Sequence, residues 1–210
     1  YTTALNVGQD KLAIGTDKIG NEEYLTIVRD IKTKKILTKD TIKTSGNFFF
    51  AKNDYLFYTV LDRERRPYQV RRHTLGNDPK NDLIVYEEKN PSFFVSCGLS
   101  HQDRFIYIDT SQHDTDEIWF FESDQKIPKP RLIKKRASDF EYGVNYHPET
   151  DSFFILTNKD KAVDYKIMKV STKNPNVENW KTFLDHKPGR LILDIMIIKG
   201  WLIRSVRDNF

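Results

Sequence analysis

Short apolar runs alternate with polar, turn-forming residues along the whole chain. The most regular motif, called the recurring phrase below, has a polar pair of residues (its polar tip), an apolar run of strand length and a polar residue at its end. It occurs five times, as QDKLAIGTD at 9–17, NDYLFYTVLD at 53–62, QDRFIYIDTS at 102–111, TDSFFILTNKD at 150–160 and, more loosely, KGWLIRSVRD at 199–208. Each copy is typical of a half-buried β-strand that follows a turn.

The copies recur at a nearly constant period. Aligned on the first apolar residue, they start at Leu12, Leu56, Phe105, Phe153 and Trp201. Successive starts are therefore 44, 49, 48 and 48 residues apart. Self-similarity at such a period indicates a repeat architecture, in which each copy is one supersecondary unit.

Each repeat holds further apolar runs in a fixed order. A second run opens twelve residues after each of the first four starts, a third opens roughly 25 residues after them, and another run precedes each start,. Four short strands per repeat are the blade of a β-propeller, so we predict an all-β partial β-propeller of four-stranded antiparallel blades. The alternative is an all-β sandwich with coincidental spacing, which the fixed order of the four runs disfavours.

The spacing sets the expected blade boundaries. One partial propeller domain covers 1–210, and its blades are expected at about 1–44, 45–92, 93–140 and 141–188, with an incomplete blade at 189–210,. A closed propeller leaves only short, protected sheet edges. A half blade therefore predicts that the chain is a fragment of a longer propeller, an expectation that its opening directly on a strand-like run without a Met supports.

Charge and cysteine content narrow the possible partners and compartment. The net charge is only +4 with acids and bases interspersed, and no basic stripe with stacking aromatics indicates nucleic-acid binding,. The most apolar stretch, 191–203, is interrupted by Asp194 and Lys199, so no membrane span is expected,. The single cysteine, Cys97, permits no intramolecular disulfide, which favours a reducing, cytoplasmic location,.

Few residues suggest chemistry. Cys97 and His101 could form a nucleophile and base, but no orienting group is evident, and a buried, inert cysteine is the simpler interpretation,. His113 shares a loop with Asp114, Asp116 and Glu117, yet no paired spacing indicates a metal site,. We therefore assign no catalytic, cofactor-binding or metal-binding residue and expect no cofactor.

Other polar and aromatic groups have structural interpretations that compete with functional ones. His73, near Glu87 and Glu88 of the next strand, could face a peptide or another domain, but a cross-strand ion-pair ladder is favoured,. The aromatic residues of 47–58 could stack on a ligand, but packing between blades is favoured,. Trp180 fits a partner surface and blade packing equally well, and the basic run 134–136 fits a solvated edge,.

One segment carries a family resemblance. Asp62-x-x-x-Arg66-Pro67-x-x-Val70-x-Arg72-His73-x-Leu75-Gly76, followed by Asp82-x-Ile84-Val85-Tyr86-Glu87-Glu88, resembles the propeller of the prolyl oligopeptidase family of serine peptidases, and its oligopeptidase B (protease II) branch in particular. Gly20-x-Glu22-x-Tyr24 and the turn in DTSQHDTDEIWFF add to it, although Asp116 stands where a small hydroxyl residue is expected. The resemblance is strong over 55–120 and loose after 140.

The resemblance implies a function for a longer protein. Enzymes of this family pair a seven-bladed propeller, which admits only short substrates, with a C-terminal α/β-hydrolase domain that holds a Ser/Asp/His triad. The oligopeptidase B branch cleaves short peptides after Arg or Lys. The nucleophile elbow Gly-x-Ser-x-Gly does not occur in this chain, so no catalytic residue transfers to it and we expect it to be inactive by itself,.

Two hypotheses remain open at this point. The first is that the chain is about four and a half blades of the gating propeller of such a peptidase, whose partners are the missing hydrolase domain and, through the full enzyme, short basic peptides. The second is a non-catalytic propeller scaffold for protein–protein interaction. In either case an unfinished blade would expose a sheet edge and apolar surface, so self-association is expected.

Overall fold

The computed structural model describes residues 1–39 and 41–208, which form β-strands joined by turns and single-turn 3-10 segments. The first sheet holds β1 (Thr2–Leu5), β2 (Lys11–Thr16), β3 (Tyr24–Asp30) and β4 (Ile42–Thr44). The second holds β5 (Phe48–Phe50), β6 (Leu56–Leu61), β7 (Pro67–His73) and β8 (Leu83–Glu87). The third holds β9 (Phe94–Leu99), β10 (Phe105–Gln112), β11 (Thr115–Glu122) and β12 (Arg131–Lys134). The fourth holds β13 (Tyr142–His147), β14 (Ser152–Thr157), β15 (Lys166–Ser171) and β16 (Lys181–Leu184), and a last pair holds β17 (Arg190–Ile198) and β18 (Trp201–Asp208).

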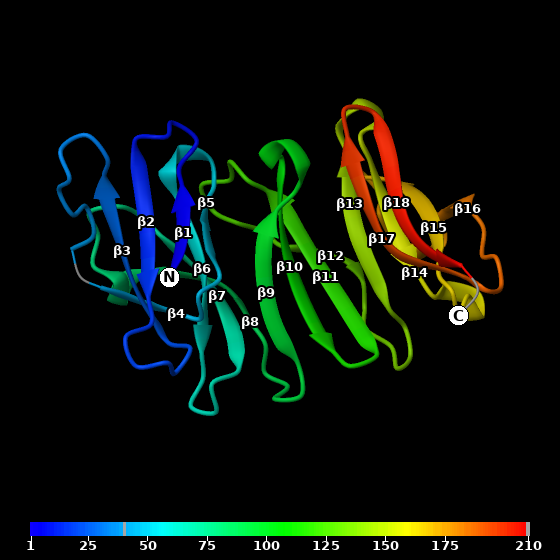
Figure 1. The fold of residues 1–210 in the computed structure, drawn as a ribbon, viewed down its shortest axis with the longest axis horizontal. Coiled ribbons are helices and arrows are strands. Elements are labelled where there is room, and N and C mark those ends of the chain that lie inside the picture. The colour runs from blue at the N-terminus through cyan, green and yellow to red at the C-terminus, as the bar shows by residue number, and fades with distance from the viewer. Residues whose placement is uncertain (40, 209–210) are drawn as a thin grey trace. The chain divides into compact units, whose positions relative to one another are not determined.

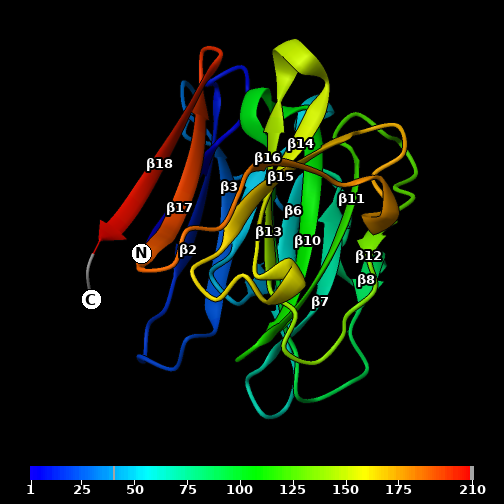
Figure 2. The same ribbon diagram turned by 90° about the vertical axis from the view of Figure 1, so that its right-hand side faces the viewer.

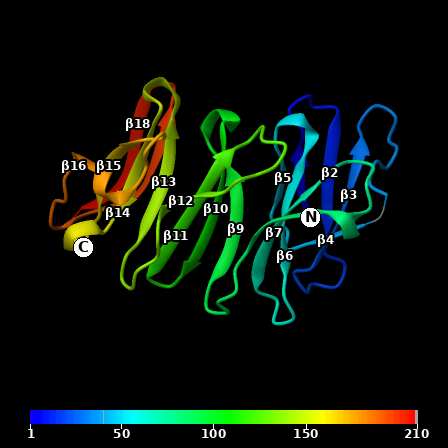
Figure 3. The same ribbon diagram turned by 180° about the vertical axis from the view of Figure 1, so that it is seen from behind.

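Strands that follow one another in the chain are neighbours in every sheet (Figures 1 and 3). This simple up-and-down order, repeated in four four-stranded sheets and begun in a two-stranded one, is that of propeller blades,. The predicted fold class, an all-β partial β-propeller of four-stranded antiparallel blades, is thereby confirmed. No helix in the described part of the chain has the length and hydrophobicity needed to cross a membrane.

The recurring sequence phrase is the turn and second strand of each sheet. In the second and third sheets the polar tip supplies two successive left-handed residues, Asn53–Asp54 and Gln102–Asp103. Lys199–Gly200 does the same before β18. Between β17 and β18, where Ile198 pairs with Trp201, two left-handed residues make the two-residue hairpin turn whose twist matches that of the strands it joins,. Gly200 suits this turn because its φ is +79°, in the left-handed region that favours glycine,.

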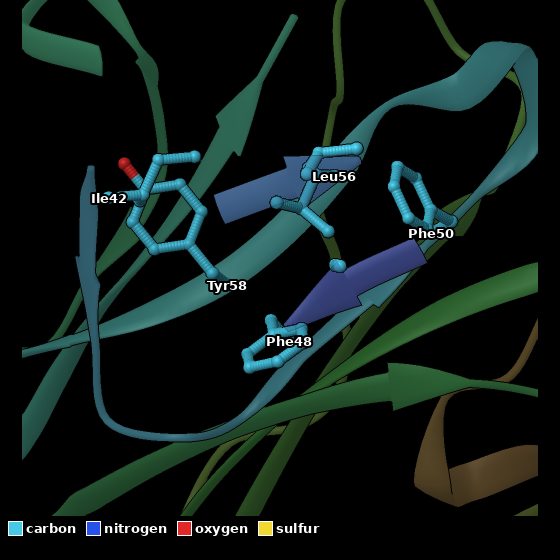
Figure 4. Packing of buried hydrophobic residues seen from close by; sticks show 7 residues of the cluster. Ile42, Phe48, Phe50, Leu56 and Tyr58 are labelled. Carbon is cyan, nitrogen blue, oxygen red and sulfur yellow. The ribbon is translucent and has the colours of Figure 1, made fainter. Parts of the chain in front are cut away.

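Two compact units make up the described chain. One comprises 1–99, 103–110 and 120–130, the other comprises 100–102, 111–119 and 131–208, and the third sheet contributes to both. In the first unit, the core joins the first two sheets (Figure 4). Its buried members are Ala13, Val28, Ile42, Phe48, Phe50, Leu56 and Tyr58. Each is at most 8% exposed, so Phe48, Phe50 and Tyr58 of the aromatic segment 47–58 serve packing rather than ligand stacking,.

The second unit has its own core between the fourth sheet and the last strand pair. It is built from Phe154, Ile167, Ile192, Ile195 and Ile197. Seen from the side, β17 and β18 form one long hairpin (Figure 2). From Ile195 to Ile198 buried and exposed residues alternate along β17, which is the pattern of a strand covered on one face only, and a register shift between Ile192 and Asp194 interrupts this alternation,.

Candidate functional site

Cys97 is a structural residue on β9. Its side chain is 5% exposed, and burial, followed by the negative charge of Asp109, raises the pKa of the thiol far above its usual range. The backbone carries the main contacts, because the Cys97 N–H donates to Oδ1 of Asn47 at 3.0 Å and its carbonyl accepts from Asn47 Nδ2 at 3.0 Å. His101 is exposed on a separate turn. A buried thiol that stays protonated is no nucleophile.

The histidine and acidic residues of 113–117 do not converge. His113 is exposed at the turn before β11, and Asp114 accepts a hydrogen bond from Thr115 Oγ1. Asp116 and Glu117 are neighbours on β11 and therefore point to opposite faces of the sheet,. Within residues 1–39 and 41–208, no three His, Cys, Asp or Glu side chains group closely enough to hold a metal ion.

His73 is fully buried and pairs with Asp82, which corrects the expectation that Glu87 and Glu88 face it. Nδ1 of His73 lies 2.8 and 3.0 Å from the two carboxylate oxygens of Asp82. The Tyr58 hydroxyl donates to the same carboxylate at 2.8 Å. Burial and the charge of Asp82 raise the pKa of Tyr58, so the Tyr58 hydroxyl keeps its proton and donates it to Asp82 within the blade,.

Antiparallel pairing explains the difference. Arg71 lies opposite Ile84 and Arg72 opposite Leu83, so the end of β7 meets the beginning of β8. His73 therefore lies beside the residue that precedes β8, whereas Glu87 lies opposite Gln69 and accepts from its Nε2. The pairing also shifts register between Val70 and Arg71, so counting the two strands in opposite directions from the sequence alone does not give the partner of His73,.

Arg66, from the segment that carries the family resemblance, clamps the connection between the second and third sheets. Its guanidinium donates to the carbonyls of Asn90 at 3.0 Å, Phe93 at 2.7 Å and Glu88 at 3.4 Å. Nε donates to Asp62 at 2.9 Å, and Asp62 also accepts from the Arg66 backbone N–H. The Asp62–Arg66 pair thus has a positioning role in the blade rather than a chemical one.

Two groups of the second unit with raised pKa values, Tyr165 and Asp116, lie in or near the lining of a depression of about 560 Å³. Phe140, Glu141, Asn158 and Tyr165 belong to its lining. The Tyr165 hydroxyl donates to Glu141 at 2.7 Å, and burial together with this carboxylate raises the pKa of Tyr165 to about 12. Nearby, burial and then the charge of Glu141 raise the pKa of Asp116 to about 6,.

The basic run 134–136 begins at the last residue of the outermost strand β12, but it is not simply a solvated edge. Nη2 of Arg136 pairs with Glu117 at 2.8 Å, and Glu117 is 5% exposed. Burial opposes ionisation of Glu117, but the hydrogen bonds from Arg136 outweigh it and lower the pKa of the carboxyl. Lys134 lies 3.8 Å from the centre of the Phe140 ring, and burial lowers its pKa.

Trp180 belongs to the interior of the second unit. It is 7% exposed, its Nε1 donates to the Pro175 carbonyl at 2.8 Å, and its ring contacts Phe140 and Tyr142. A side chain so enclosed cannot serve as a partner surface. Packing is the interpretation that the structure supports.

Comparisons with known proteins identify the family. The family model "Prolyl oligopeptidase, N-terminal beta-propeller domain" matches residues 2–210. Protease 2 of Moraxella lacunata is 27% identical over 208 residues, which cover 98% of this chain and 29% of that protein. Prolyl endopeptidase-like of Homo sapiens is 33% identical over 158 residues, covering 74% of this chain and 21% of that protein. Oligopeptidase B from Leishmania major shares the fold with a TM-score of 0.93 at 22% identity, over 99% of this chain and 29% of that one.

The repeated four-stranded sheets thus define a β-propeller, and the family match relates this propeller to those of peptidases. The chain belongs to the prolyl oligopeptidase family, as part of its N-terminal β-propeller domain. It spans less than a third of the length of the relatives it matches. Two residues that carry the family resemblance have structural contacts. Arg66 binds the connection between the second and third sheets, and His73 binds Asp82 within the second sheet.

Proposed function

We propose that this chain is part of the β-propeller of an oligopeptidase-B-like serine peptidase, and that the full enzyme cleaves short peptides after Arg or Lys. The observation that carries the proposal is the similarity to Protease 2 over 98% of the chain. The fold likeness to oligopeptidase B, with a TM-score of 0.93, is consistent with it. The missing partner would be a C-terminal α/β-hydrolase domain that supplies the Ser/Asp/His triad.

In this proposal the propeller contributes exclusion rather than chemistry. A rigid wall of blades beside a catalytic domain limits which substrates reach the nucleophile, and rigid β-blades suit that role. The chain contains no Gly-x-Ser-x-Gly elbow, and its one cysteine is buried with a raised pKa. We therefore propose that it is inactive alone, and that its reduced cysteine belongs to a cytoplasmic protein.

The test compares this chain with the full-length product of its gene. Both are assayed with short chromogenic peptides that place Arg, Lys or Pro before the cleaved bond. The Pro substrate is included because one relative is named prolyl endopeptidase-like and is 33% identical. Hydrolysis after Arg or Lys by the full product, with none by the isolated chain, supports the proposal. A preference of the full product for Pro contradicts the proposed Arg and Lys specificity. Activity in the isolated chain contradicts it.

The exclusion of large substrates by the propeller is tested by comparing the cleavage of a short and a folded substrate. The full product is given one Arg-containing cleavage sequence twice, first as a short peptide and then within a folded protein loop. Selective cleavage of the short peptide supports exclusion by the propeller. Equal cleavage contradicts it, and inactivity towards every substrate favours the alternative of a non-catalytic propeller scaffold.

A further inference from the structure

The depression of about 560 Å³ lies at one end of the fourth sheet. Its lining comes from the connection that leads into β13 and from the connection between β14 and β15. Tyr142 of β13 lies opposite Thr157 of β14, which lies opposite Lys166 of β15, so both connections meet at the same end. All four strands of this sheet belong to the chain, and the depression is therefore formed within one complete sheet.

The carboxylate of Glu141 is held in a fixed position in this lining. Its Oε2 accepts from the Tyr165 hydroxyl at 2.7 Å, and its Oε1 accepts from Asn158 Nδ2 at 3.4 Å. The Glu141 backbone N–H donates to Asn158 Oδ1 at 3.0 Å, and its carbonyl accepts from Thr157 Oγ1 at 2.8 Å. A carboxylate has about four acceptor sites. Roughly two therefore remain for a ligand, and a side chain that is already ordered loses little entropy on binding it.

The negative charge of Glu141 is not neutralised by a neighbouring cation. In the part of the chain that the structure describes, no lysine, arginine or histidine forms an ion pair with it. Lys159, which lines the same depression, pairs instead with Asp160 at 2.8 Å. Burial and then the charge of Glu141 raise the pKa of Asp116 to about 6, as expected beside an uncompensated carboxylate,.

The aromatic part of the lining already attracts a cation. Nζ of Lys134 lies 3.8 Å from the centre of the Phe140 ring, and it donates to the Lys135 carbonyl at 2.7 Å. Such a contact arises because the electron-rich face of an aromatic ring attracts positive charge. Lys161 also lines the depression, but it is exposed, so its hydrated ammonium group competes only weakly for Glu141,.

We propose that this depression binds the guanidinium group of an arginine side chain in a peptide, with Glu141 accepting its N–H groups beside the ring of Tyr165. A guanidinium is planar and weakly hydrated, binds a carboxylate through two N–H groups and stacks on aromatic rings. Val163 of the lining is 73% exposed and can contact the aliphatic stem,. That the peptide is a substrate of the full enzyme rests on the proposed function. The guanidinium site itself does not.

The test uses the whole 210-residue chain and two small probes, N-acetylarginine amide and N-acetylcitrulline amide. The probes have nearly the same shape, but only the first carries a positive charge. Binding is measured by amide chemical-shift titration of the labelled chain. The arginine probe is expected to bind at least about tenfold more tightly and to shift amides of 139–141 and 158–165. Failure of the arginine probe to bind, or equal binding of the two probes, overturns the proposal.

Three variants test the role of the carboxylate. Glu141→Gln removes the charge but keeps an oxygen that accepts from Tyr165, so its circular dichroism spectrum should match that of the parent while its preference for the arginine probe disappears. Glu149→Gln makes the same change at an exposed position of the second unit and should leave the preference intact. Lys161→Gln removes the competing cation and should tighten binding of the arginine probe.

The variants also define the results that contradict the site. An unchanged preference in Glu141→Gln, an equal loss in Glu149→Gln, or weaker binding of the arginine probe to Lys161→Gln overturns it. Because hydrolysis is not measured, this outcome is independent of the peptidase assay. Arginine binding by the chain together with an inactive full-length product would retain the guanidinium site and contradict only the proposed function.

Discussion

At the scale of single residues, Asp82 joins two buried side chains of the second sheet. It accepts hydrogen bonds from Tyr58 and from His73, which is fully buried. Asp82→Ala leaves two buried donors without a partner, so we expect the free energy of unfolding to fall by about 3 kcal/mol. Urea unfolding followed by circular dichroism measures the change.

The control for that prediction is Asp124→Ala, which removes an exposed carboxylate from the same unit. It should change stability by less than about 0.5 kcal/mol. Equal effects of the two substitutions would show that the network around Asp82 contributes nothing specific.

Asp116 makes stability depend on pH in the opposite direction to a typical carboxylate. Its pKa is raised to about 6, so the folded protein holds a proton that the unfolded chain has already released,. This carboxyl therefore lowers stability as pH rises from about 4 to about 6, and the loss persists above that range. Asp116→Asn should stabilise the protein at pH 7 by about 1 kcal/mol, a value that allows for partial solvent screening.

Unfolding in urea at several pH values tests this sign. The difference between Asp116→Asn and the parent chain should be small near pH 4 and reach its full size by about pH 7. Asp114→Asn, in the turn that precedes β11, is the matched control, and the same trend in that variant would show that the effect is not specific to Asp116. A difference that shrinks as pH rises would contradict the assigned cause.

Residue partners were harder to predict than residue environments. The buried state of Cys97 follows from its place in an apolar run, and the structure places it there,. The partner of His73 required the strand register, and Arg136 pairs with Glu117 across 19 positions of sequence. Such contacts depend on where a turn ends, and a hydrophobic pattern does not fix turn ends to the nearest residue.

At the scale of elements, the connection between the second and third sheets depends on Arg66. Three backbone carbonyls converge on its guanidinium, and only a planar fork can bind them together,. Arg66→Lys should lower the free energy of unfolding by about 2 kcal/mol and speed amide exchange in 88–95. Hydrogen exchange with mass spectrometry measures the local effect.

The neighbouring Arg63 supplies the matched control. It is exposed, so Arg63→Lys should change neither stability nor exchange in 88–95,. If Arg66→Lys leaves exchange in that segment unchanged, the carbonyl clamp does not hold the connection.

The strands themselves were predictable because the repeat averages out local ambiguity. One short apolar run is compatible with several structures, but five copies at one spacing predict the same hairpin each time,. The turn residues agree with that prediction, since Asn53 and Asp54 adopt the left-handed conformation that a tight hairpin needs,. Local turn chemistry and the long-range period therefore indicate the same element, which is typical of a sequence that folds reliably.

At the scale of the whole molecule, the described residues form a series of short antiparallel sheets whose charged side chains take part in internal contacts. His73 and Glu117, two charged residues that the sequence offered as candidates, are committed to buried internal contacts with Asp82 and Arg136. A sequence pattern cannot separate such buried ion pairs from a functional site, because both place charged residues between apolar runs. Burial and partners, which only the fold provides, make the distinction.

The last strand pair predicts how the whole chain behaves in solution. Met196 lies opposite Ile203, and Ile198 lies opposite Trp201, so the four side chains share one face of the hairpin,. They are between 41% and 74% exposed. Contiguous apolar surface of this kind favours association. We therefore expect the purified chain to self-associate, with a mass in light scattering that rises with protein concentration.

Charge on this face should weaken that association. Trp201→Lys/Ile203→Lys places two cations where the apolar side chains stood, so the concentration dependence of the mass should largely disappear. Ile127→Lys is the control, because Ile127 is 68% exposed but lies on a loop of the first unit. It should leave the association unchanged. A parent chain that stays monomeric at every concentration would show that the exposed hairpin face does not drive self-association.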